Sequence, residues 1–162
     1  MERHVERLRE ARNDGRDHRR DATARRGDRA GAQIVSRRTR AEARNVVVTL
    51  RGTNASLPPL VVMTPRSSWW QSTAERGGGL VCFLECLRTL STEPVGRRVV
   101  LTANSGHELG HLGLDAFLAD RVGWDRPGGA VWVHFGANIG ATGGELSLVC
   151  PDDGLRATML AG

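Results

Sequence analysis

Residues 97–120 read RRVVLTANSGHELGHLGLDAFLAD, an apolar β-branched run followed by a turn and a second apolar pattern. The composition of residues 97–103 predicts a buried strand, and residues 104–106 predict the turn after it. From Glu108 to about Asp120 the apolar residues recur at helical spacing, at Leu109, Leu112, Phe117 and Leu118. A short apolar strand followed by a helix is typical of a sheet that helices cover.

The same kinds of segment flank this stretch on both sides. Apolar runs at residues 45–50, 60–64 and 130–135 predict three more strands, and residues 145–149 predict a last one. Residues 80–90 predict a helix with one apolar stripe, and the glycine-rich residues 66–79 before it predict a loop. We therefore expect an α/β fold with three layers, αβα, around a mostly parallel mixed sheet.

The composition divides the chain near residue 44. Residues 1–44 hold fourteen Arg and eight acidic residues, whereas residues 45–162 hold nine Arg and ten acidic residues. Residues 1–44 carry too few apolar side chains for a core and predict an Arg-rich arm, disordered or loosely helical. Such an arm can bind nucleic acid, but no aromatic residue lies among its arginines to stack on bases, so nucleic acid is not the expected partner. Residues 45–162 are the expected α/β domain.

The sequence also gives an expectation for the cellular location. No apolar run approaches the ~20 residues that cross a bilayer, so no membrane partner is expected. The three cysteines are an odd number, and no secretion signal precedes them, which argues against a disulfide framework. A cytoplasmic protein is the expectation.

Residues 107–111 match the pattern His-Glu-x-x-His. On one helix, His107 and His111 share a face and can bind one Zn²⁺, while Glu108 acts on a metal-bound water as general base. His134 and Asp115 are the downstream candidates for a third ligand. The alternative is a polar helix start, with His107 and Glu108 as capping residues.

Residues 45–140 also resemble the co-catalytic zinc aminopeptidases and their relatives, the glutamate carboxypeptidases and glutaminyl cyclases. The resemblance rests on element order and on the turn Glu75-Arg76-Gly77-Gly78-Gly79, which stands where the family has Asp-Asn-x-Ser-Gly. It also rests on His107-Glu108-Leu109-Gly110, which stands at the family's Glu-Glu pair and the following Leu-Gly. The resemblance implies a zinc-exopeptidase-like fold, incomplete because the chain ends before the family's further strands. It implies a hydrolase acting on a peptide or a small amide substrate.

Several metal-ligand positions of that family differ here. Pro65-Arg66-Ser67 stands at the family's His-x-Asp, and His134-Phe135-Gly136 stands at its Asn-x-Asp. Glu75 would replace the bridging Asp and Glu108 keeps the place of a zinc-binding carboxylate, while His107 replaces the general base. Two oxygen ligands are too few for two zinc ions.

Two interpretations follow from this resemblance. One is a rearranged single zinc site built from His107, Glu108, His111 and Glu75, with His134 as an additional ligand. The other is a non-catalytic pseudo-peptidase scaffold used for binding.

Three further residues are candidates for ligand contact. Trp69 and Trp70 follow a predicted strand and either form an aromatic wall for a substrate or pack in the core. Asn138 lies in the loop after the 130–135 strand and either contacts the site or only shapes a turn. A truncated sheet would also leave an exposed edge, through which self-association is expected.

Overall fold

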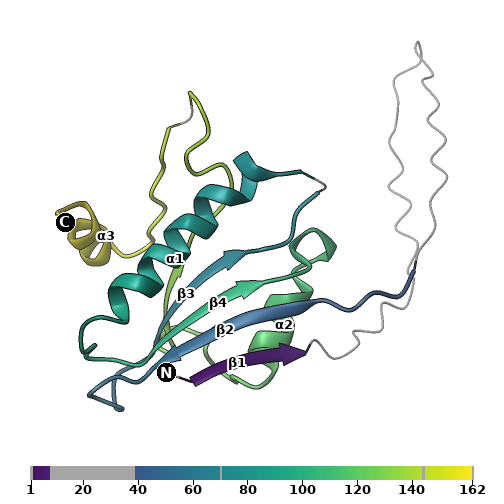
Figure 1. The fold of residues 1–162 in the computed structure, drawn as a ribbon. Coiled ribbons are helices and arrows are strands. Elements are labelled where there is room, and N and C mark those ends of the chain that lie inside the picture. Colours follow the sequence, from purple (N-terminus) through teal and green to yellow (C-terminus); the bar gives the residue numbers. More distant parts are fainter. Residues whose placement is uncertain (1, 8–38, 70, 144, 162) are drawn as a thin grey trace, which may run out of the picture.

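The structure, a computed structural model, describes residues 2–7, 39–69, 71–143 and 145–161. Its centre is one five-stranded sheet in the order β1-β2-β4-β3-β5 (Figure 1). The strands span β1 Glu2–Arg7, β2 Arg44–Leu50, β3 Leu60–Pro65, β4 Val99–Asn104 and β5 Val131–His134. The strands predicted at residues 45–50, 60–64, 97–103 and 130–135 are therefore present.

The sheet is mixed, but it is not mostly parallel as the sequence predicted. β3 runs parallel to both β4 and β5, whereas β2 runs antiparallel to both β1 and β4. Residues 51–59 join β2 to β3 without a helix. This connection is too short to cross back over the sheet, so β3 runs in the opposite direction to β2. The start of β2 therefore lies at the same edge as the carboxyl ends of β3 and β4.

One helix covers each face of the sheet (Figure 1). Side chains alternate between the two faces of each strand. On one face, Leu101 and its neighbours pack against Phe83 of α1, which spans Gly78–Leu90, and form one core. The residues between them, including Val61 and Val100, pack against Phe117 of α2, Leu112–Ala119, in a second core. The chain therefore has the expected α/β class, with helices on both faces of the sheet.

The helix predicted over residues 108–120 is broken. A 3₁₀ turn, η2, spans His107–Leu109, and α2 begins only at Leu112. Between them Gly110 and His111 have φ of 86° and 65°, which a continuing right-handed helix excludes. The loop predicted at residues 66–79 is also partly helical, because a five-residue π-helix, η1 Thr73–Gly77, leads into α1.

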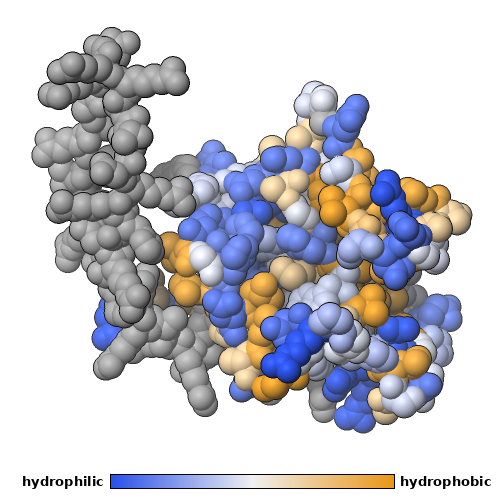
Figure 2. Space-filling view, turned by 180° about the vertical axis from the view of Figure 1, so that it is seen from behind, coloured by the Kyte–Doolittle hydropathy of each residue, from blue (hydrophilic) through white to orange (hydrophobic). Residues whose placement is uncertain are grey.

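The two ends of the chain differ from the predictions. Glu2–Arg7 is an edge strand rather than the start of a loose helix, and residues 8–38 lie outside the described residues. Residues 145–149 form no strand and are followed by α3, Asp153–Ala161, whose residues are exposed. Figure 2 shows hydrophobic residues gathered on the side of the molecule that carries α3. Within the described residues, no helix has the length and apolar character needed to span a membrane.

Candidate functional site

The candidate site lies where β3 and β4 end and β2 begins. Asn45 of β2 is fully buried and clamps the turn after β4: its Nδ2 donates to the Gly113 carbonyl at 2.7 Å, and its Oδ1 accepts from the Ser105 amide at 3.0 Å. A Cβ on Gly113 would lie 2.3 Å from the Ser105 oxygen, so only glycine allows this approach. The clamp fixes the position of residues 105–111 relative to the sheet.

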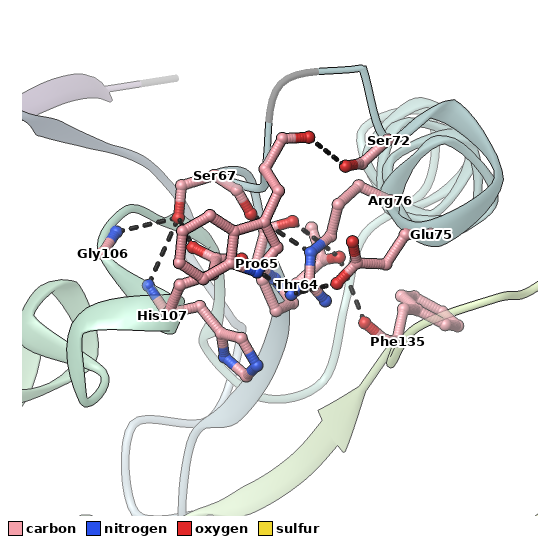
Figure 3. A network of polar contacts seen from close by, with 11 residues as sticks. Thr64, Pro65, Ser67, Ser72, Glu75, Arg76, Gly106, His107 and Phe135 are labelled. Carbon is pink, nitrogen blue, oxygen red and sulfur yellow. Dashed lines mark hydrogen bonds and ion pairs between the residues drawn. The ribbon is translucent and has the colours of Figure 1, made fainter. Parts of the chain in front are cut away.

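Ser67 connects the loop after β3 to the turn after β4. Its hydroxyl accepts hydrogen bonds from the backbone amides of Gly106, at 2.9 Å, and His107, at 3.2 Å. The same hydroxyl donates to Oε2 of Glu108 at 2.9 Å. Figure 3 shows Ser67 between the turn that carries His107 and the helical turn that carries Arg76. The hydroxyl therefore orients Glu108 and uses its only proton to do so.

Arg76 lies between the two carboxylates that the sequence proposed as metal ligands. Its Nη2 is 2.9 Å from Oε1 of Glu75 and 2.9 Å from Oε1 of Glu108 (Figure 3). Its Nε donates to the Ser67 carbonyl at 3.1 Å. The side chains of Arg76 and Glu108 are only 7% and 11% exposed, so this contact is largely removed from water. The structure thus brings Glu75 and Glu108 together around a guanidinium.

The electrostatics of Glu108 follow from these contacts. Burial alone raises the pKa of a carboxylate, but hydrogen bonds from the backbone, Arg76 and Ser67 outweigh it, and the pKa of Glu108 is lowered. The carboxylate is therefore ionised, and each of its oxygens accepts a hydrogen bond. A general base that works near neutral pH needs a raised pKa, which Glu108 lacks.

The three candidate histidines gather beside this ion pair. The rings of His107 and His111 meet edge to face, with centroids 4.4 Å apart. Burial and the nearby charge of Arg76 lower the pKa of His107. Burial and the nearby His107, Arg76 and His111 lower the pKa of His134 at the end of β5. The lowered pKa values favour the neutral form of the His107 and His134 imidazoles near neutral pH.

The helical geometry expected for His-Glu-x-x-His is absent. His107 starts a 3₁₀ turn and His111 is left-handed, so the two residues do not lie one turn apart on a single α-helix. Glu108 points to Arg76 and Ser67 instead. The expectation that His107 and His111 share one face of a single α-helix is therefore wrong, and the role of Glu108 as general base stays a prediction.

The described residues do not fit a zinc ion. In the part of the chain that the structure describes, no group of three or more His, Cys, Asp or Glu side chains is placed to hold a metal. Glu75 and Glu108, the two oxygen ligands expected, both pair with Arg76. Asp115, the other downstream candidate, is exposed on α2.

The loop after β5 reaches the site through its backbone. The Asn138 amide donates to the Glu75 carbonyl at 2.9 Å, while the Asn138 side chain is exposed. A Cβ on Gly78 would lie 1.7 Å from the Ile139 oxygen, so the glycine run lets α1 start against this loop. The backbone of Asn138 therefore joins this loop to η1, and ligand contact by its exposed side chain stays a prediction.

The aromatic pair is only partly described. Trp69 is 69% exposed and is not a core residue, which leaves it available for contact with a ligand. Its carbonyl accepts a hydrogen bond from Ser72 (Figure 3). Trp70 lies outside the described residues. The interpretation of Trp69 as core packing is wrong, and the aromatic wall stays a prediction.

Two residues that organise the site were not among the residues predicted to form it. Ser67 stood at a position where family ligands are lost, and Arg76 stood beside a proposed ligand. Their position in the sequence could have identified Ser67 and Arg76. Both lie in the segment that follows the end of β3, a buried parallel strand, and ligand sites in α/β sheets lie at such strand ends.

The sequence matches no known protein family, and no curated protein matches it either.

Proposed function

We propose that this chain is a non-catalytic binding domain of the zinc-aminopeptidase-like type, in which Arg76 takes the place of the catalytic metal. One observation carries the proposal: a single buried guanidinium nitrogen lies 2.9 Å from both Glu75 and Glu108. By the resemblance, these are the two carboxylates left to hold zinc.

Charge is the physical reason that a metal is disfavoured there. A guanidinium keeps its charge at every accessible pH, so it cannot leave the site as a neutral group. A dication placed on the same carboxylates would meet this fixed positive charge at a distance of a few ångströms. Expelling Arg76 would also break its bond to the Ser67 carbonyl. The carboxylates are therefore committed to an internal ion pair.

Chemistry at Glu108 is disfavoured for a related reason. The pKa of Glu108 is lowered, and each of its oxygens accepts a hydrogen bond from Arg76 or Ser67. Ser67 in turn donates a hydrogen bond to Glu108 and accepts two amide hydrogen bonds, which occupy both lone pairs of its hydroxyl oxygen and leave none for nucleophilic attack. The network of Ser67, Arg76 and Glu108 therefore has the features of a rigid, preorganised wall.

A zinc titration of the full chain tests this proposal. We expect calorimetry on the metal-stripped protein to detect no stoichiometric zinc binding of the kind that Glu108→Gln would remove. In a separate assay, we expect no amidase activity that a chelator abolishes. Cys86→Ser is the matched control, because Cys82 and Cys86 lie four apart on α1 and can bind zinc adventitiously. One zinc per chain, retained in Cys86→Ser and lost in Glu108→Gln, would overturn the proposal. That result would favour the rival prediction of a metallopeptidase acting on a peptide or a small amide.

Nucleic-acid binding through the Arg-rich arm stays a prediction. The arm lies mostly outside the described residues, so the site geometry neither favours nor weakens it. Deleting residues 1–38 should remove a salt-sensitive binding signal if such a signal exists.

A further inference from the structure

A hollow of about 520 Å³ opens beside the Ser67 network at the same edge of the sheet. Its lining residues come from the start of β2, from the loop after β3 and from the turn after β4; they are Glu42, Ala43, Arg44, Arg66, Ser67 and Ser105. A volume of this size suits a small molecule and not a folded partner. The antiparallel β2 creates the hollow, because it brings Arg44 next to the strand ends.

Two arginines, Arg44 and Arg66, and one carboxylate, that of Glu42, line this hollow. Arg66 is held in place: its Nη1 donates to the Arg44 carbonyl at 2.6 Å, and its backbone amide donates to the Asn104 carbonyl at 2.8 Å. A guanidinium has five N–H donors, and this contact uses one of them. The remaining donors form a planar fork that matches an oxyanion.

Arg44 is the second positive group of the hollow. Its carbonyl accepts hydrogen bonds from Arg66 and, at 2.7 Å, from the Ser105 hydroxyl, so its backbone is fixed. Its guanidinium is 3.9 Å from Glu42, in a pair whose side chains are 52% and 83% exposed. Exposed pairs of this length are weak, so a ligand oxyanion can replace Glu42.

Arg76 offsets one of the two negative charges of Glu75 and Glu108 in the neighbouring network. Neither carboxylate lines the hollow, and Glu108 is held by hydrogen bonds from Arg76 and Ser67. The Ser67 and Ser105 hydroxyls both donate their hydrogen bonds to protein acceptors, so the two arginines supply the donors that can bind a ligand. The hollow thus has a positive wall, formed by Arg44 and Arg66, and one displaceable acidic side chain, that of Glu42.

We infer that the hollow binds a small oxyanion, either a carboxylate or a phosphate group, between Arg44 and Arg66. The inference rests on the proposed binding role, since it names the ligand class for the same edge of the sheet. Carboxylates and phosphates share the chemistry that recognises them here, namely paired oxygens facing a guanidinium fork.

Calorimetry on the full chain tests the inference with succinate, citrate and inorganic phosphate as probes. The titrations are done at constant ionic strength with EDTA present. We expect at least one probe to bind, and Arg66→Gln to weaken that binding about tenfold or more, the value of one charge-assisted hydrogen bond. Glu42→Gln should strengthen binding several-fold, because it removes the competing carboxylate. Binding of the two carboxylate probes alone identifies a carboxylate site, and binding of phosphate alone identifies a phosphate site.

Arg126→Gln is the matched control. Arg126 is an exposed arginine in the loop before β5, and its substitution removes the same charge from the chain. The inference is overturned if no probe binds, if Arg66→Gln leaves the affinity unchanged, or if Arg126→Gln weakens binding equally. Glu42 is exposed, so its variant keeps the fold and gives an answer even if Arg66→Gln is unstable. Zinc plays no part in this test, so a failed zinc prediction and a failed anion prediction remain distinct.

Discussion

Replacing Arg76 with Met should destabilise the chain strongly, because it leaves Glu108 as a largely buried charge without its cation. Removing one partner of a buried ion pair costs about 3–5 kcal/mol. Glu108 is 11% exposed and keeps its hydrogen bond from Ser67, whereas Glu75 is 31% exposed and can turn toward solvent. We therefore expect the lower end of that range, about 3 kcal/mol, with Glu108 as the main source.

Urea unfolding followed by circular dichroism measures this loss. Arg88→Met on α1 is the matched control, because Arg88 also pairs with a glutamate but both side chains are more than half exposed, at 70% and 58%. Its effect should be much smaller. The double variant Arg76→Met/Glu108→Gln should recover about 1–2 kcal/mol of the loss, since no charge is left unpaired. The reasoning fails if Arg76→Met costs no more than Arg88→Met, or if the second substitution recovers nothing.

Three other perturbations test the packing and the electrostatics. Gly113→Ala should lower the free energy of unfolding in urea by about 2–3 kcal/mol, because the new Cβ would lie 2.3 Å from a backbone oxygen. The control, Gly96→Ala, places its Cβ where no atom lies within 4 Å and should be nearly neutral. Phe117→Ala should cost about 3–5 kcal/mol and change tryptophan fluorescence, because its fully buried ring contacts two Trp rings. The lowered pKa values of His107 and His134 mean that the unfolded chain binds protons first, so stability should fall as the pH drops below about 6.5. Replacing both histidines with Gln should flatten that pH dependence.

Each of these outcomes can be contradicted. An unchanged midpoint for Gly113→Ala would mean that the turn after β4 is not clamped as described. A Phe117→Ala loss no larger than that of an exposed α3 substitution would place the core elsewhere. Stability that is constant between pH 7 and pH 5 would remove the inferred difference in histidine protonation.

The strands and α1 were predictable because local pattern and tertiary packing agree there. Residues 60–64 and 97–103 are apolar on both faces, and β3 and β4 are buried on both faces. The break at Gly110 and His111 was not predictable from periodicity. The apolar residues keep helical spacing across it, while the clamp by Asn45 decides where α2 begins. Residues 145–149 alternate like a strand but pair with no described strand.

The proximity of Glu75 and Glu108 was predictable, but the side chain that pairs with both of them was not. The end of β4 was identified as its position, and Glu75 and Glu108 do lie together there. What the sequence could not show is the orientation of Arg76, which depends on the π-helical register of η1. Arg76 follows Glu75 in the sequence and is the ion-pair partner of both proposed metal ligands, Glu75 and Glu108.

The close seating of α1 on the loop after β5 links parts of the chain that are far apart in sequence. Gly78 touches Ile139, the Asn138 amide binds the Glu75 carbonyl, and Glu75 shares Arg76 with Glu108. We therefore expect a displacement of residues 136–140 to shift the Glu75 backbone and, with it, the guanidinium of Arg76. A ligand that moves this loop would then change the pKa of Glu108 without touching it, and an NMR titration of that carboxylate would report the event.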